Sequence, residues 1–424
     1  MAQRLRSVAG SLITIGDEIL FGDIPNGNAH HIAVELRSRG FRLERMITVG
    51  DDENEISKTL SRCHRESQFL IVTGGLGPTD DDRTNASVCS AFNRQLVLDP
   101  GYTRWLKERL AKRGRSWSAQ LAKMAQLPQG ADKLGVGMAG YFLEHDSVPC
   151  YFLPGVPHEM KTLLAELVIP DLEKRFPDRP VCIKRVIRIL GFYESELNQR
   201  LKEIETEASG VEIGYLPHDA EIQLTLLASA ESEKEARDRI ADLDRKIVEL
   251  IGREHVIGRN EETLERVIGE KLRAKGWRMA IAESCTGGLV AGRIAAVPGA
   301  SDYLDRALVT YSNEAKEQLL KVPGEMISAS GAVSHEVALA MAQGVGGQAQ
   351  VEVSLAVTGI AGPTGGTEGK PVGTVYIACT TPKRSEVEKH LFAGNRELIQ
   401  ERAAQAALIL LWRNLEDASN IHCH

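Results

Sequence analysis

A serine follows a short apolar run in the segment RMAIAESCTGGLVAGRI (278–294). The apolar run predicts a strand that ends at Ala282, and the glycines predict a turn into a helix that begins near Gly287. Ser284 then lies on a strand-to-helix turn, where unpaired backbone N–H groups face a bound anion or an oxyanion. A serine at this position also serves as a helix cap, so this segment alone leaves nucleophile and cap as alternatives.

A lysine in a second segment, LVTYSNEAKEQLL (308–320), is the candidate base for that serine. The pattern predicts a strand ending at Tyr311 and a helix starting around Asn313, with Lys316 in its first turn, where the helix dipole disfavours a cation. Neither segment contains a histidine, and a serine hydroxyl needs a base. Lys316 could act if burial, the helix terminus or a cationic neighbour lowered its pKa from about 10.4 toward about 8. Tyr311 could orient the transferred proton or simply fill the core.

Glycine-rich turns follow three further apolar runs, as TGIAGP (358–363), TGGLGPTDDDRT (73–84) and LPGVPHEM (153–160). Such turns allow backbone amides to close around a phosphate, and they also occur as plain tight turns. The acids of the second turn could bind a divalent cation that bridges phosphates, with Glu18 and Asp17 of the neighbouring loop, or could complement a helix dipole. The predicted phosphate residues in this half are Gly74, Gly75, Gly77, Thr79, Asp81, Pro154 and Gly155, and the predicted metal ligands are Asp80, Asp81, Asp82 and Glu18.

Short apolar runs (11–15, 45–49, 69–73 and 148–153) alternate with amphipathic segments up to about residue 175, which predicts a doubly wound α/β domain. A Pro-rich, charged segment then precedes a small α+β module, and the segment GREHVIGRNEE (252–262) is interpreted as a linker to further βα units. The predicted domains are residues 1–176, 177–258 and 259–415, followed by a polar tail, 416–424. The HCH ending (422–424) is a metal-binding alternative without a fixed geometry.

Composition restricts the function classes. The 424 residues carry a net charge of -7, which argues against nucleic acid as a partner. Seven scattered cysteines without a CxxC pair indicate reduced thiols rather than a disulfide framework. No run approaches the roughly 18 to 20 apolar residues of a membrane span. A soluble, cytoplasmic protein without a membrane partner is expected.

Six ordered motifs of the last third, AESCTGG, VPGAS, TYSNEAK, GAVS, MAQGV and TGIAGP with KPVGTVY, resemble the C-terminal nicotinamide-nucleotide amidohydrolase domain of the CinA family over about residues 263–411. The resemblance implies deamidation of nicotinamide mononucleotide (NMN) to nicotinic acid mononucleotide and ammonia, without a cofactor. It implies Ser284 as nucleophile, Lys316 as base and Tyr311 as their partner. The implied substrate-binding residues are Thr286, Gly287, Gly288, Thr358, Gly359 and Arg396.

The first domain resembles the molybdopterin-binding fold of the same family, which implies a metal-dependent ADP-ribose diphosphatase. This sequence departs from the family pattern at Asp17, where a Thr is usual, at Asn26, where an Asp is usual, and in GMAGY (137–141), where GTAPG is usual. The middle module resembles the family's KH-like domain but has no GXXG loop or basic cluster to clamp RNA. It is interpreted as a spacer and as an element of a homodimer.

The residues allow two other functions to be considered. One is a regulatory protein linked to competence or DNA damage, in which the nucleotide sites bind without catalysis. The other is a short-chain oxidoreductase, which would use a Tyr-x3-Lys pair. The spacing here is Tyr-x4-Lys and no GxGxxG follows the first strand, so the oxidoreductase is set aside.

Overall fold

The computed structural model describes residues 8–416, apart from 113, 115, 136, 209 and 219. The HCH ending therefore lies outside the described residues. The chain forms two compact units, residues 1–183 with 228–239, and residues 184–227 with 240–424. Among the described helices, none combines the length and the apolar character that a membrane crossing requires.

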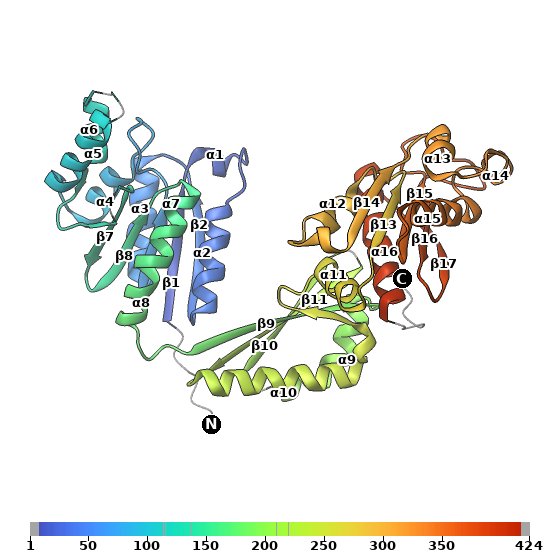
Figure 1. Cartoon of the computed structure of the whole chain (residues 1–424). Helices are drawn as coiled ribbons and strands as arrows, with labels where there is room; N and C mark the ends of the chain where they lie inside the picture. Colours follow the sequence, from blue (N-terminus) through green and yellow to red (C-terminus); the bar gives the residue numbers. More distant parts are fainter. Residues whose placement is uncertain are drawn as a thin grey trace. The chain divides into compact units, whose positions relative to one another are not determined.

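The first unit contains a six-stranded sheet in the order β2-β1-β3-β8-β7-β6 (Figure 1). The strands β1 (Val8–Ile15), β2 (Phe41–Val49), β3 (Phe69–Thr73) and β8 (Val148–Leu153) run parallel. The strands β7 (Gly140–His145) and β6 (Asp132–Leu134) add an antiparallel edge. The central strands β1, β3 and β8 are apolar throughout because both faces of a doubly wound sheet are covered by helices.

Helices cover both faces of this sheet. On one face α2 (Gly27–Ser38), α7 (Pro157–Leu163) and α8 (Ile169–Arg175) pack around Leu12, Phe41 and Phe69. On the other face α3 (Glu53–Glu66) and α4 (Thr84–Phe92) pack around Ile13, Leu70 and Phe152. The remaining elements are α1 (Asp17–Leu20), β4 (Leu96–Leu98), α5 (Pro100–Lys112), α6 (Ala119–Met124), β5 (Gln126–Pro128) and a π-helical turn (Leu164–Val168) between α7 and α8.

The middle module is a four-stranded sheet in the order β10-β11-β9-β12, with two helices packed on its core. Its elements are β9 (Val181–Leu190), α9 (Glu194–Glu207), β10 (Val211–His218), β11 (Glu221–Ala230), α10 (Glu233–Ile251) and β12 (Val256–Arg259). The expectation of a plain linker over 252–262 was wrong for its centre, because Val256 and Ile257 are buried and β12 pairs with β9.

The C-terminal third is built on a five-stranded sheet in the order β14-β13-β15-β16-β17. The strands β13 (Met279–Glu283), β14 (Leu304–Val309) and β15 (Val353–Gly359) are parallel, and β16 (Thr374–Thr380) and β17 (Ser385–Leu391) continue the sheet antiparallel. The helices are α11 (Leu264–Lys275), α12 (Leu289–Ala295), α13 (Asn313–Leu320), α14 (Gly324–Ser330), α15 (His335–Ala349) and α16 (Arg396–Glu416). Helices α11 and α16 lie on one face of the sheet and α15 on the other (Figure 1).

The predicted mixed α/β fold, with an α+β middle module, is therefore confirmed. Three element ends differ from expectation. The strand before Ser284 extends to Glu283, the helix after it begins at Leu289 rather than near Gly287, and β14 ends at Val309 rather than at Tyr311. The turn between β13 and α12 therefore spans residues 284–288, and the turn between β14 and α13 spans residues 310–312. The amides of Ser284 and Thr310 donate to the carbonyls of Val357 and Glu283 on neighbouring strands, while the amide of Gly287 donates within its own turn to the carbonyl of Ser284.

Candidate active site

Ser284 lies at the carboxyl end of β13, on the turn that leads into α12. Its amide donates to the carbonyl of Val357 at 3.0 Å, which ties the turn to the neighbouring strand β15. Gly287 and Gly288 both have positive φ, +63° and +106°, so the chain can reverse only where a side chain is absent. The hydroxyl is presented from a rigid, buried turn, with Ser284 8% exposed.

Lys316 is brought to this serine by α13. Its Nζ lies 3.2 Å from the Oγ of Ser284, 2.8 Å from the carbonyl oxygen of Thr310 and 3.3 Å from that of Tyr311. The side chain is 1% exposed. Ser312 caps α13 by accepting from the amide of Ala315, which fixes the helix start and so the position of the lysine.

Burial lowers the pKa of Lys316 below its ordinary value. A cationic neighbour was the other predicted cause, but among the described residues none contributes to the lowering. Burial raises the pKa of the Cys285 thiol to about 12. Ser284 therefore has a base beside it, whereas the neighbouring Cys285 stays a thiol and is a poor nucleophile.

Glu283 is a residue of this site that the sequence analysis did not assign. It is completely buried, and its carboxylate accepts hydrogen bonds from the amides of Gly288 at 2.9 Å, Val290 at 3.2 Å and Ala291 at 2.8 Å. The available signal was an acid placed directly before a glycine turn that opens a helix.

The expected amide donors of the turn need a correction. The amide of Gly287 donates to the carbonyl of Ser284 at 3.1 Å, and that of Gly288 donates to Glu283, so neither is available to a substrate. In the part of the chain that is described, the amides of Cys285 and Thr286 donate to no oxygen. The buried hydroxyl of Thr286 also lacks a hydrogen-bond partner among the described residues.

The phenol of Tyr311 lies elsewhere than expected. It is bound by Arg396, whose Nη2 donates to the hydroxyl at 2.6 Å, and the Tyr311 side chain is 59% exposed. Among the described residues, no hydrogen bond joins this phenol to Ser284 or Lys316, and Tyr311 reaches Lys316 through its backbone carbonyl. The strand ends at Val309, two residues earlier than predicted, so Tyr311 lies in the turn that leads into α13.

Arg396 also donates to the carbonyl of Gly362 at 2.7 Å, so it joins the TGIAGP turn to the Tyr311 loop from the start of α16. Thr358 is buried and donates to the carbonyl of Ala332 at 2.8 Å. At Gly359 a Cβ would come within 3.0 Å of the Cys285 sulfur, so only glycine fits there. The structure thus brings Ser284, Lys316 and Thr286 together, while Arg396 and Tyr311 form a second, more exposed group.

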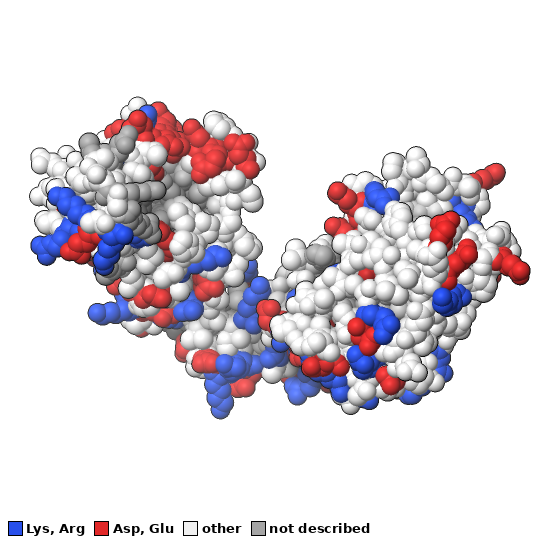
Figure 2. Space-filling view, turned by 45° about the horizontal axis from the view of Figure 1, so that its top comes forward, with Lys and Arg blue, Asp and Glu red and all other residues white. Residues whose placement is uncertain are grey.

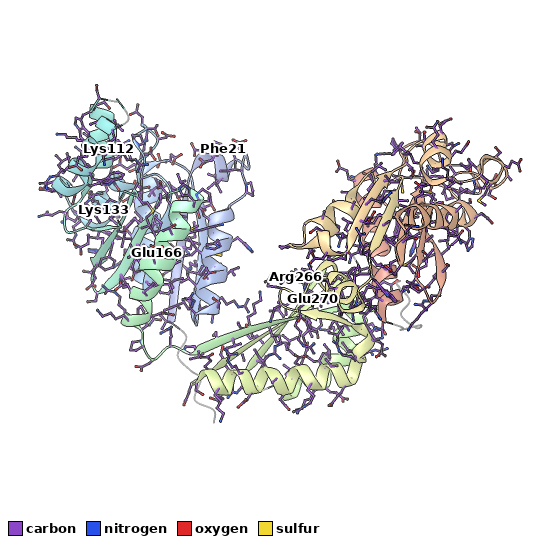
Figure 3. All side chains as sticks on the ribbon, in the orientation of Figure 1. Phe21, Lys112, Lys133, Glu166, Arg266 and Glu270 are labelled. Atoms are coloured by element: carbon purple, nitrogen blue, oxygen red, sulfur yellow. The ribbon has the colours of Figure 1, made fainter. Side chains whose placement is uncertain are left out.

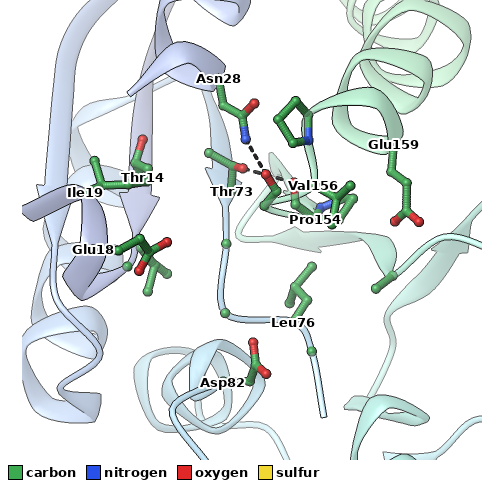
Figure 4. A pocket seen from close by; sticks show the side chains of 18 of the residues that line it. Thr14, Glu18, Ile19, Asn28, Thr73, Leu76, Asp82, Pro154, Val156 and Glu159 are labelled. Atoms are coloured by element: carbon green, nitrogen blue, oxygen red, sulfur yellow. Dashed lines mark hydrogen bonds between the residues drawn. The ribbon is translucent and has the colours of Figure 1, made fainter. Parts of the chain in front are cut away.

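The first unit contains a separate cavity of about 620 Å³ at the carboxyl ends of β1, β3 and β8. Of the predicted phosphate residues, Gly74, Gly75, Gly77, Asp81, Pro154 and Gly155 line this cavity, and Thr79 does not. Asn28 donates to the carbonyl of Gly155 and Thr73 to that of Pro154, which fasten the three loops together (Figure 4). Ile19 and Ile24 add an apolar wall beside Phe21, which is 73% exposed at the end of α1 (Figure 3).

Acidic side chains gather at this end of the first unit (Figure 2). Of the predicted metal residues, Glu18, Asp81 and Asp82 line the cavity and Asp80 does not. Asp82 already accepts from the amide of Thr79 at 2.8 Å and from its hydroxyl, so it fastens its own loop.

Asp51, which the sequence analysis did not name, also lines the cavity. The pKa of its carboxyl is raised, first by burial and then by the charges of Asp17, Glu18 and Asp81. Its Oδ2 accepts from the amide of Asp17 at 3.1 Å, and the Oδ1 of Asp17 accepts from the amide of Asp51 at 3.2 Å. An acid directly after β2 was the available signal.

His64, His145 and Asp146 form another group with metal-binding side chains, in which the potential ligand atoms lie within 4.8 Å of one another. His64 donates through Nε2 to the carbonyl of His145 at 2.8 Å, and the His145 ring stacks on Phe92. These contacts explain the position of both imidazole rings by packing between α3 and the β7-β8 hairpin.

Fold and site together define a multidomain α/β protein with a buried Ser–Lys pair. The chain matches the family models described as "CinA C-terminal domain" over residues 261–415, "Probable molybdopterin binding domain" over 11–174 and "Damage-inducible protein CinA KH domain" over 184–258. It is 60% identical over 423 residues to a CinA-like protein of Syntrophobacter fumaroxidans, with all of both chains covered. The chain belongs to the CinA family.

Two further relatives cover different lengths. A CinA-like protein of Geobacter sulfurreducens is 40% identical over 406 residues, which are 95% of this chain and 98% of that one. The crystal structure of the competence damage-inducible protein A from Klebsiella pneumoniae is 35% identical and covers 37% of this chain and 97% of its own, with a TM-score of 0.36.

Proposed function

We propose that the C-terminal domain is an amidohydrolase that deamidates NMN through a Ser284 ester intermediate. The observation that carries this proposal is the contact of the Lys316 Nζ with the Ser284 Oγ at 3.2 Å, inside a buried site. Family membership also supports this proposal, since the last third of the chain resembles the nicotinamide-nucleotide amidohydrolase domain.

The three oxygen contacts of Lys316 suit a general base. The carbonyls of Thr310 and Tyr311 can only accept, so each takes one N–H of the amine. A neutral amine has two N–H groups and one lone pair, and that lone pair is then left for the hydroxyl proton of Ser284. A protonated amine would instead donate its third N–H to the Oγ. The two carbonyls orient the base, and burial favours its neutral form.

In the first half-reaction Lys316 takes the hydroxyl proton as the Ser284 Oγ bonds to the carboxamide carbon of NMN. The proton then passes to the amide nitrogen, the C–N bond breaks and ammonia leaves, with the acyl group esterified to Ser284. Water loses a proton to Lys316 and attacks the ester carbon. The bond from that carbon to the Ser284 Oγ breaks, Lys316 returns the proton to the Oγ, and nicotinic acid mononucleotide leaves. The Cys285 and Thr286 amides are the donors of the turn that remain for the oxyanion. Arg396 supplies the positive charge for the substrate phosphate.

The test is ammonia release from NMN without added metal, measured for the wild-type chain, Ser284→Ala and Ser328→Ala. Ser328 lies in α14 and donates to the carbonyl of Gly324, so its replacement is a matched serine control. Turnover that disappears only in Ser284→Ala supports the proposal. A folded wild-type protein without turnover contradicts it and favours the regulatory, non-catalytic alternative.

We further propose that the cavity of the first unit binds a nucleoside diphosphate sugar such as ADP-ribose, together with a divalent cation, and hydrolyses its diphosphate. The specific support is that Glu18, Asp51 and Asp81 line the same cavity and that the charges of Glu18 and Asp81 raise the pKa of Asp51, a repulsion that a bound cation would relieve. These carboxylates would hold the cation, which would supply Lewis-acid activation of the diphosphate. The glycine turns at 74–77 and 154–155 would contact the phosphates through backbone amides. Metal-dependent release of AMP from ADP-ribose is the corresponding assay.

A further inference from the structure

We propose that Glu283 is a positioning residue that holds both Ser284 and the strand end that orients Lys316. This inference rests on the proposed function of the Ser–Lys site. It concerns a carboxylate that contacts neither the nucleophilic oxygen nor the base nitrogen by a hydrogen bond among the described residues, and so acts through its neighbours.

The side chain of Glu283 organises the nucleophile turn. Its two carboxylate oxygens accept three amides, those of Gly288, Val290 and Ala291, at 2.8–3.2 Å. These amides come directly after the turn 284–287, so the carboxylate closes the loop that carries Ser284 back onto its own strand. Charge-assisted hydrogen bonds of this kind are about twice as strong as neutral ones.

The backbone of Glu283 reaches the base. Its carbonyl accepts the amide of Thr310 at 2.7 Å, and the carbonyl of Thr310 in turn accepts the Nζ of Lys316 at 2.8 Å. The residue before the nucleophile is therefore joined to the base through one intervening residue. A displacement of Glu283 would move the serine and the lysine together with their shared contact.

The choice of an acid follows from the donors around it. Three N–H groups converge on this side chain, and a carboxylate is acceptor-only, whereas a glutamine would direct an NH₂ group at one of them. The three amides that Glu283 accepts are distinct from those of Cys285 and Thr286, which face the Cys285 sulfur.

The experiment compares the full-length wild type, Glu283→Gln and Glu265→Gln in their rate of labelling by a fluorophosphonate, a probe that reacts with activated serines. Glu265 is the matched control, because it is a partly buried carboxylate that contacts the other end of α12 by accepting from the Nε of Arg293 at 2.7 Å. Ser284→Ala gives the background, and thermal unfolding shows that each variant is folded.

We expect Glu283→Gln to be labelled about tenfold to a hundredfold more slowly, the loss that corresponds to one charge-assisted hydrogen bond, while Glu265→Gln keeps the wild-type rate. On NMN, kcat falls and KM stays unchanged, and the midpoint of the pH profile keeps its wild-type value, because the base itself is retained. If Glu283→Gln does not fold, Glu283→Asp, which keeps the charge with a shorter reach, is expected to be folded and slower than the wild type.

Wild-type labelling of a folded Glu283→Gln or Glu283→Asp variant would overturn the inference. An equal loss in Glu265→Gln would also overturn it, since the effect would then be one of helix anchoring. A wild type that is labelled at Ser284 but releases no ammonia from NMN contradicts the proposed substrate and leaves the positioning role intact.

Discussion

The Nζ of Lys316 lies 3.2 Å from the Oγ of Ser284, and both side chains are buried. This distance joins residues 32 positions apart in the sequence, one at the end of β13 and the other in the first turn of α13. Because burial lowers the pKa of the amine, the pair titrates closer to neutrality than an exposed lysine.

The pH dependence of deamidation should follow this lysine. Only the neutral amine can accept the serine proton, so kcat/KM is expected to rise with pH, to level off above the lowered pKa of Lys316, and to fall at lower pH. Initial rates of ammonia release across the neutral to alkaline range measure this profile. A rate that is flat in pH through the titration of the amine would contradict the assignment.

Lys316→Arg is the sharper test of the same base. Arginine keeps the positive charge and can donate to the carbonyls of Thr310 and Tyr311, but it stays protonated in proteins. Turnover is therefore expected to fall by about a hundredfold to ten-thousandfold, the usual contribution of general base catalysis. The solvent-exposed Lys321, which follows α13, provides the control as Lys321→Arg, with activity unchanged.

Tyr311→Phe should have a small effect on kcat. The Tyr311 hydroxyl binds Arg396 at 2.6 Å rather than Ser284 or Lys316. Its loss therefore removes a contact of Arg396, the proposed phosphate ligand, and leaves proton transfer between Ser284 and Lys316 unchanged, because Lys316 contacts only the backbone carbonyl of Tyr311. We expect kcat within about tenfold of wild type, below the general acid–base range, and a higher KM. A loss of kcat similar to that of Lys316→Arg would restore the tyrosine to the proton transfer.

Much of this architecture could be read from the sequence. Runs such as 69–73 and 148–153 are apolar without interruption, and they form β3 and β8 with the predicted bounds. Ser284 and Lys316 were predictable because each follows a strand with glycine or polar turn residues, and parallel strands bring their carboxyl ends together.

The features that the sequence did not predict depend on contacts between residues far apart in the chain, and a local pattern of residue types does not contain such contacts. The Tyr311 hydroxyl is bound by Arg396, which is 85 residues away in the sequence, so its contact could not be predicted from the segment around Tyr311. Glu283 and Asp51 differ from surface acids only through what surrounds them, three converging amides in one case and neighbouring carboxylates in the other. Likewise, strand β12 is short and lies between charged residues, so it forms a strand only because it pairs with β9.

Arg396→Gln should reduce the preference for a phosphorylated substrate. The guanidinium is held by Gly362 and Tyr311, so it is fixed in place before a phosphate arrives. An Arg–phosphate contact contributes about 1.5–3 kcal/mol, which corresponds to about a tenfold to a hundredfold rise in KM for NMN. Nicotinamide riboside should be unaffected. Arg402→Gln, on the same helix and bound to the carbonyl of Ala393, is the control that should leave both substrates unchanged.

Asp51→Asn should act on the first unit in two opposite directions. Burial and the charges of Asp17, Glu18 and Asp81 raise the pKa of this carboxyl in the folded state. The folded protein then binds more protons than the unfolded chain, so stability falls as the pH rises from the unfolded value of 3.8 through the raised value. Without metal, Asp51→Asn is therefore expected to melt at a higher temperature than wild type at pH 7.5, and the difference should shrink toward pH 4.

Added Mg²⁺ or Mn²⁺ should raise the melting temperature of Asp51→Asn less than that of the wild type, and metal-dependent ADP-ribose hydrolysis should fall about tenfold to a hundredfold. Asp80→Asn, on an exposed acid outside the cavity wall, should reproduce neither change, and a wild-type metal response in Asp51→Asn would remove Asp51 from the cation site.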